Sequence, residues 1–219
     1  MTAGYIGSKG VNFKDKLPIQ RDATNVKRSD LKSYLQTMDL NYYGKSFNNL
    51  LNNSLSRLDK LDSMRGQISS LSISGGNAIG YYTNMNGTFI EIIRTTVTFS
   101  TDIHMAKELN SYTNFLLAKE RAGIERAIGA VTFAENKFLP GMRVKFNKLV
   151  AEQDAFLYSF TKLTNQDILT YYNNTVQGNA IDEVTRMRNI ALNANSIGGF
   201  GVNSSFWFDQ ITSKINKLF

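Results

Sequence analysis

The sequence predicts an all-α protein made of two antiparallel four-helix bundles that arose by an internal duplication. Three observations lead to this prediction. The 219 residues include only two prolines, apolar residues recur at helical spacing over long runs, and three sequence pairs repeat in the same order in both halves. Apolar residues make up 42% of the chain and charged residues 20%, which is typical of a globular protein of one large domain or two small bundles.

The first half is expected to hold three helices after a short apolar start that turns at Gly7 and Gly10. They cover residues 12–40, 45–71 and 78–98, and glycines 75 and 76 separate the last two. The second half begins at FSTD, where Ser100, Thr101 or Asp102 can cap a helix that runs to about residue 135. The remaining helices are expected over residues 141–172, 179–195 and 204–218.

With the N-terminal stub this makes eight helices, four in each half, and we predict sub-bundles over roughly residues 1–99 and 100–219. The final KINKLF stops without a cap and the opening MTAGYIGSKG starts abruptly, so we expect an excised domain whose first helix is truncated.

Gapless sequence matches support the duplication. LDKLDSMR at 58–65 aligns with IDEVTRMR at 181–188, and FKDKLPIQ at 13–20 aligns with FNKLVAEQ at 146–153. A weaker match sets YTNMNGTFIEI at 82–92 against WFDQITSKINK at 207–217. Because all three pairs keep the same order in both halves, we interpret them as a duplicated four-helix unit.

Polar residues interrupt several of the predicted apolar stripes. In AKERAGIERA at 118–127, Arg121 falls on a stripe with Leu117, Ile124, Ile128 and Val131. The other residues placed in this way are Arg65, Arg188, Gln20 and Gln153. A polar group in a core stripe requires a partner, water or a ligand.

Two interpretations stay open for these arginines. Each can pair with a carboxylate of its own bundle, as Arg121 could with Glu125 one helical turn away. Alternatively, two or three of them converge between helices and bind a planar oxyanion, because guanidinium offers parallel N–H donors that match such an anion. Buried pairs contribute little net stability, which weakens the first interpretation when several recur.

Composition excludes several kinds of site. The chain has no cysteine and one histidine, His104, which rules out disulfides, cysteine zinc sites and multi-histidine metal sites. We find no phosphate loop and no nucleophile motif, and we expect no catalytic residue, metal or cofactor. The formal charge of +7 is spread along the chain, so nucleic-acid binding is the third-ranked hypothesis. No transmembrane span or signal peptide is visible.

Three segments resemble a known family. LLAKERAGIERA, followed by a glutamine-containing helix with QDAFLYSF and by SFWFDQITSKI, is similar to the nitrate- and nitrite-sensing (NIT) domain of bacterial receptors over nearly the whole chain. The resemblance implies two four-helix bundles and a nitrate or nitrite ligand bound by arginines near the interface of the bundles. Arg121 matches the arginine of the family's second-half motif, and Arg188 matches a later Met-Arg position. The family's Glu-Arg-Gly, which normally precedes a segment like TAGYIGSKG, is missing here.

We therefore expect a single, non-catalytic sensor domain over residues 1–219 that signals by helix rearrangement. The resemblance implies a periplasmic location in a membrane-anchored chemoreceptor, with a cytoplasmic location left open, and we expect a homodimer. The alternative is a structural dimerisation domain whose buried arginines are paired internally. The candidate ligand-binding residues are Arg65, Arg121, Arg126, Gln153 and Arg188.

Overall fold

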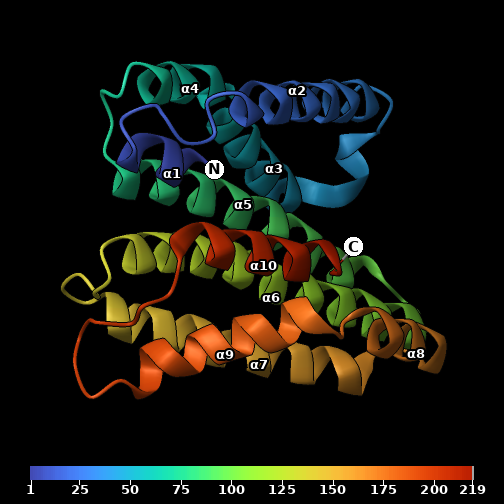
Figure 1. Ribbon diagram of the computed structural model, residues 1–219. Helices are drawn as coiled ribbons and strands as arrows, with labels where there is room; N and C mark the ends of the chain where they lie inside the picture. Colours follow the sequence, from blue (N-terminus) through green and yellow to red (C-terminus); the bar gives the residue numbers. More distant parts are fainter. Residues whose placement is uncertain (219) are drawn as a thin grey trace. The chain divides into compact units, whose positions relative to one another are not determined.

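The computed structural model describes residues 1–218, and Figure 1 shows that this part of the chain is built from helices joined by loops. One isolated antiparallel bridge, between Lys137 and Gly198, joins two loops. The chain divides into two compact units, one formed by residues 1–95 and the other beginning at Thr96. Each unit is described by itself below.

The first unit is built from helices of different lengths and has a small core. Its elements are α1 (Thr2–Gly7), α2 (Lys16–Leu35), the 3₁₀ turn η1 (Leu40–Tyr43), α3 (Gly44–Asp59), α4 (Leu61–Ser69) and α5 (Gly75–Thr96). Ile68 and Ala78 are fully buried beside Leu17. A separate cluster joins Leu58, Leu61 and Met85.

The helix predicted over 45–71 is wrong in one respect, because the structure has two helices there. α3 ends at Asp59, α4 begins at Leu61, and Lys60 between them has a ψ angle of −4°. No proline or glycine lies at this break, so no local signal marks it. Leu58 and Leu61 on either side both enter the same apolar cluster, and we attribute the bend to that packing.

The second unit forms a bundle around its longest helix. The 3₁₀ turn η2 (Val97–Phe99) leads into α6 (Ile103–Ala134), which packs against α7 (Met142–Leu163) and α10 (Ser204–Asn216). α9 (Asn179–Asn193) lies against α10. Side chains cap these helices as expected from their type: Asp102 accepts from two backbone N–H groups at the start of α6, and Asn203 accepts from the Phe206 N–H at the start of α10.

The helix predicted over 141–172 also divides in two. α7 ends at Leu163, and a short helix, α8 (Gln166–Thr175), follows. Thr164 has an extended backbone, and the Asn165 side chain accepts a hydrogen bond from the Ile168 N–H, 2.9 Å away. Asn165 is thus an N-cap, which stops one helix and starts the next.

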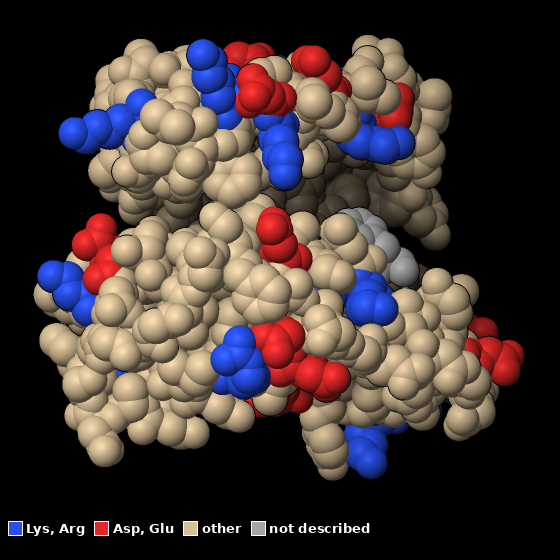
Figure 2. Space-filling view, in the orientation of Figure 1, with Lys and Arg blue, Asp and Glu red and all other residues tan. Residues whose placement is uncertain are grey.

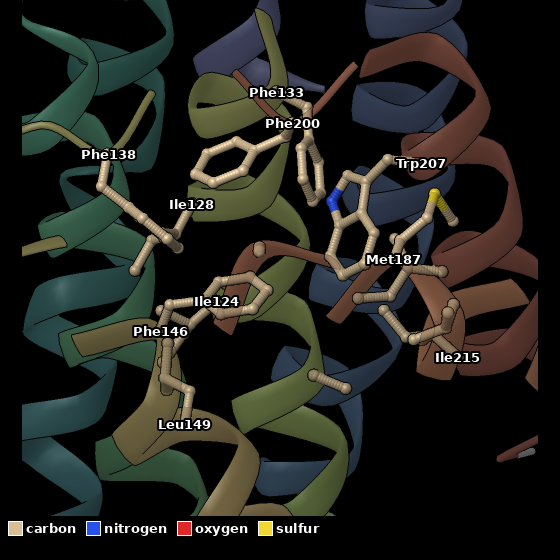
Figure 3. Close-up of a cluster of buried hydrophobic side chains, with 14 residues drawn as sticks. Ile124, Ile128, Phe133, Phe138, Phe146, Leu149, Met187, Phe200, Trp207 and Ile215 are labelled. Atoms are coloured by element: carbon tan, nitrogen blue, oxygen red, sulfur yellow. The ribbon is translucent and has the colours of Figure 1, made fainter. Parts of the chain in front are cut away.

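Aromatic side chains from three helices and two loops fill the core of the second unit (Figure 3). Trp207 and Phe146 are fully buried, and the ring centroids of Trp207 and Phe133 lie 5.2 Å apart. The Trp207 indole N–H donates to the Arg126 carbonyl over 3.2 Å. Burial of each such ring contributes about 2–3 kcal/mol of hydrophobic stabilisation. This core fixes α10 against α6.

Candidate functional site

Four polar side chains, one from each main helix of the second unit, meet inside its bundle. They are Glu125 of α6, Gln153 of α7, Arg188 of α9 and Lys214 of α10, and we call them the polar tetrad. Glu125 is fully buried, and the other three are between 2% and 8% exposed. Groups of this kind are seldom buried unless each is paired, so their partners decide what the cluster can do.

The tetrad is held by a connected set of hydrogen bonds centred on Glu125. Arg188 donates to both carboxylate oxygens, each over 2.6 Å, in a bidentate ion pair. The Gln153 amide donates to Glu125 over 2.8 Å and accepts from Arg188 over 2.9 Å. Lys214 reaches the same Gln153 oxygen at 3.5 Å, the longest contact of the set. Three of the four residues are therefore well paired, and Lys214 is held weakly.

The charges of the tetrad do not balance when Lys214 is protonated. Two cations then share one carboxylate in a buried space. Burial, followed by repulsion from Arg188, lowers the pKa of Lys214 to about 8, while Glu125 and Asp154 act in the opposite direction. The tetrad thus carries its excess positive charge at neutral pH and loses it as the pH rises through about 8.

The buried face of α6 lies one residue away from the predicted stripe. Ile124 and Ile128 are buried as expected, but Arg121 is only partly buried. The most deeply buried positions are Ala118, Ala122, Glu125, Gly129 and Thr132. The polar residue that enters the core of AKERAGIERA is therefore Glu125, and the small residues around it make room for α10 and its Trp207.

Arg121 and Arg126 leave α6 on different sides. The Arg121 Nε donates to Glu152 of α7, and its guanidinium lies 5.7 Å from the centre of the Phe156 ring. Arg126 points to α10, where its guanidinium lies over Phe208. Five residues correspond to about 140° around a helix and about 7.5 Å along it. These two guanidinium groups therefore do not share a ligand from the same face.

Arg126 differs from the other candidates in having neutral partners. Its Nη1 donates to the Thr212 hydroxyl over 3.0 Å, and its charge lies 5.1 Å from the Phe208 ring centre. Among residues 1–218 no carboxylate pairs with it. Burial lowers the pKa of Arg126 from its ordinary value. Within residues 1–218 no acceptor receives a hydrogen bond from its Nε or Nη2, and the residue is only partly buried.

Arg65 occupies a comparable place in the first unit. It is 8% exposed and donates from Nη2 to the Arg21 carbonyl over 3.2 Å and from Nη1 to the Asn25 and Asp62 side chains. Its Nε is buried and has no hydrogen-bond partner within the described residues. The duplication pairs Arg65 with Arg188, but Gln20, the counterpart of Gln153, is exposed. The first unit thus repeats the arginine without the rest of the tetrad.

The structure brings together only part of the predicted ligand set. Arg188 and Gln153 meet, yet they meet on Glu125, and Arg121 and Arg126 point elsewhere. Sequence reasoning missed Glu125 and Lys214 as core residues. A one-residue shift of the α6 stripe would have found Glu125. Lys214 lies at helical spacing with Trp207 and Ile211, and that spacing could have identified it.

Within residues 1–218, no group of three or more acidic or histidine side chains is placed to hold a metal ion. In the same part of the chain, no helix combines the length and apolar character that a membrane span requires.

Comparison with known proteins gives two positive findings. The sequence matches the family described as nitrate and nitrite sensing (NIT) over residues 1–219. The fold is similar to that of a solved structure described as the NasR transcription antiterminator, with a TM-score of 0.90 and 18% sequence identity. The match covers 99% of this chain and 58% of that one, so this chain spans a little over half of it. No curated protein sequence matches.

Proposed function

Because the chain belongs to the nitrate and nitrite sensing family, we propose that it is a non-catalytic sensor domain that binds nitrate or nitrite. The observation that carries this proposal beyond the family is the Arg126 guanidinium, a partly buried cation whose partners are a hydroxyl and an aromatic ring. A planar monovalent anion supplies the acceptor oxygens that such a group lacks.

The arginines divide between structural and ligand-binding roles. Arg188 donates from Nε and Nη2 to the two oxygens of a fully buried carboxylate, and its Nη2 also donates to Gln153. An anion that replaced this carboxylate would displace Glu125 into an apolar core, which would cost several kcal/mol. We therefore assign Arg188 and Gln153 to the internal pairing that the structural interpretation foresaw, and Arg126 to the ligand.

Arg121 is the second candidate ligand. Its carboxylate partner, Glu152, is about 30% exposed and also contacts Lys148 at 3.7 Å. An ion pair at this exposure is worth about 1 kcal/mol or less, so Arg121 can exchange Glu152 for an anion at small cost. Arg65, which lies in the other unit, keeps one unpaired Nε donor and is the third candidate.

Binding at Arg126 would act on α6 and α10 together, because Arg126 belongs to α6 and its Thr212 partner to α10. An anion that takes donors from Arg126 changes the contact between the two helices. If the anion binds one arrangement of α10 more tightly than another, it shifts the equilibrium between these two arrangements. A non-catalytic sensor can signal in this way that its ligand is bound.

Calorimetric titration with sodium nitrate and sodium nitrite at constant ionic strength tests the ligand, with sodium chloride as reference. We expect saturable heat for nitrate or nitrite and none for chloride. Arg126→Gln should weaken binding by about tenfold or more. Arg186→Gln is the matched control, since Arg186 is a surface arginine of α9 bound to Glu183.

Two failures of this experiment have different meanings. If neither anion binds the unmodified chain at 10 mM, on the order of the weakest useful affinities, the sensing function is refuted. If Arg126→Gln binds as tightly as the unmodified chain, the assignment of Arg126 is refuted and Arg121→Gln becomes the deciding variant.

The setting of the domain is a second part of the proposal. We propose a homodimeric domain, anchored through its parent chain as the periplasmic part of a chemoreceptor. The absence of cysteine fits an exported domain. On the face shown in Figure 2, basic and acidic residues alternate and form no continuous basic stripe, which speaks against a nucleic-acid surface on that side.

The same lack of cysteine makes the signalling step measurable. Single cysteines on α2 and α9 can carry spin labels, and the distance distribution between them can be recorded with and without nitrate. A shift at saturating nitrate supports helix rearrangement, and identical distributions refute it. Sedimentation of the chain at several concentrations tests the homodimer.

A further inference from the structure

An apolar cavity of about 430 Å³ lies in the second unit, away from the polar tetrad. Three helices and the segment after α10 surround it: residues 105–115 of α6, Phe160 of α7, α8 from Ile168 to Thr175, and Lys217. The volume lies in the range of cavities that hold small organic molecules. The tetrad and Arg126 contribute nothing to this lining, so the cavity is separate from the proposed anion site.

Aromatic rings form the floor of the cavity. The centroids of Phe115 and Phe160 lie 4.9 Å apart, and Tyr172 packs against both, at 6.3 and 5.1 Å. Tilted and edge-on rings at these distances leave a face on which another ring can pack.

Several large apolar side chains at the mouth of this cavity remain in water. Met105, Tyr112, Ile168 and Tyr171 are between 42% and 64% exposed. Single exposed apolar residues are common, but a contiguous group around a hollow indicates a binding surface.

The polar groups of the cavity are separated by the length of α8. The Glu108 carboxylate accepts from the Asn165 side chain, which caps the start of α8. The Lys217 ammonium donates to the Thr175 carbonyl at the last residue of α8, over 3.3 Å. A helix of ten residues is about 15 Å long. One end of the cavity is therefore acidic and already bonded, and the other end is cationic.

The cationic end has donors to spare. The only hydrogen-bond partner of Lys217 among the described residues is a neutral carbonyl, and an ammonium has three donors. Burial raises the pKa of Tyr172 above its ordinary value, so its phenol is neutral at pH 7 and can donate. Inorganic nitrate suits this place poorly, because most of the lining is apolar and would not replace its hydration.

From these observations we propose that the cavity binds a small aromatic carboxylate, with its ring on Phe115, Phe160 and Tyr172 and its carboxylate on Lys217. Amines of the same shape lack a partner at the Lys217 end, and binding to Glu108 would place them at the other end of α8. This binding site is independent of nitrate and gives the domain a second, organic ligand.

Phenylacetate is the probe, and benzylamine and benzyl alcohol are its cationic and neutral counterparts. Binding is followed by the ¹³C-methyl NMR signal of Ile168, which lines the cavity, while Ile211, fully buried elsewhere in the unit, is the internal control. We expect phenylacetate to shift the Ile168 signal saturably and to leave the Ile211 signal in place. Either counterpart binding as tightly as phenylacetate would overturn the proposal, as would no binding.

Two substitutions locate the site. Lys217→Met keeps the apolar stem and removes the charge, and it should weaken phenylacetate about tenfold. Met105→Trp fills the partly open mouth and keeps the Ile168 reporter, and it should abolish binding in a chain whose Ile211 signal stays in place. Unchanged phenylacetate affinity in both variants would overturn the proposal. Nitrate binding, measured in the same samples, should be unaffected, so failure of either proposal is seen separately.

Discussion

Arg188→Met gives the sharpest test of the buried tetrad. The substitution keeps an unbranched side chain and removes a guanidinium that makes three hydrogen bonds, two of them to the fully buried Glu125. Glu125 then keeps only the Gln153 amide, since Lys214 contacts Gln153 and not the carboxylate. Removing one partner of a buried ion pair costs about 3–5 kcal/mol. For a unit of this size that corresponds to a fall in Tm of roughly 10–20 °C.

Trp207 makes the assay specific to the second unit. It is the one tryptophan of the chain and is fully buried in the core of that unit. Its fluorescence during urea unfolding therefore reports the free energy of unfolding of this bundle, whatever the first unit does. Arg186→Met, two residues earlier on the same helix and on the surface, is the control and should change that free energy little.

A double variant separates the pair from its surroundings. In Glu125→Leu/Arg188→Met both charges are gone, and replacement of a buried pair by apolar side chains is often neutral or stabilising. We expect the double variant to be more stable than Arg188→Met alone. If Arg188→Met costs no more than Arg186→Met, Glu125 and Arg188 are not paired in the interior, and the division of roles among the arginines falls with it.

Three further predictions concern single positions. The pKa of Lys214 in the folded chain is about 8, below the ordinary value of 10.5. Between these two pH values the unfolded chain binds more protons than the folded chain, so the free energy of unfolding should rise with pH across that window. Measured by urea unfolding at pH 7, Lys214→Met should be more stable than the unmodified chain by about 3 kcal/mol. This difference should vanish by about pH 10.5. A difference that stays constant with pH would contradict the lowered pKa of Lys214. Gly129→Ala would place a Cβ closer than 3.0 Å to the Trp207 indole and should lower the stability by about 1–3 kcal/mol. Gly123 has open space around it, so Gly123→Ala should raise the stability by about 0.5–1 kcal/mol. Equal Tm values for the two variants would refute the close contact. Asn165→Ala removes the cap of α8 and should destabilise this helix by about 1 kcal/mol. The loss should appear as faster amide exchange at Ile168. Asn203→Ala, which removes the cap of α10 and leaves α8 unchanged, is the comparison.

The helical fold was predictable because apolar periodicity is written along the whole chain, and the all-α prediction is confirmed. The two breaks were not predicted, for different reasons. At Lys60 the chain shows no proline, glycine or capping side chain, so only tertiary packing bends it. At Asn165 the signal was present, since an asparagine followed by Gln-Asp is typical of a helix start, but the apolar spacing continued across it.

The site was harder to predict than the fold because it depends on which side of α6 is buried. A shift of one residue turns a helix face by about 100°, and this exchanges Arg121 for Glu125 as the polar residue in the core. Small residues gave the better indication, because Ala118, Ala122 and Gly129 allow a close helix contact where larger side chains do not. The partner of Arg188 lies 63 residues away, and no local pattern reports a pair at that separation.

Internal pairing and anion sensing need not exclude each other, because different arginines meet different conditions. A guanidinium sealed in the core needs a permanent counter-charge, and Arg188 has one in Glu125. A guanidinium that responds to an external anion must lack such a buried counter-charge, and Arg126, which is only partly buried, pairs with a hydroxyl instead. If Arg126 had a carboxylate of its own, nitrate would compete with it at a high local concentration and sensitivity would be lost. A new acid next to Arg126, as in Thr212→Glu, should therefore abolish the nitrate heat while leaving the Trp207 fluorescence unchanged, whereas Thr212→Val should weaken binding only slightly. Undiminished nitrate binding in Thr212→Glu would show that the anion sits elsewhere.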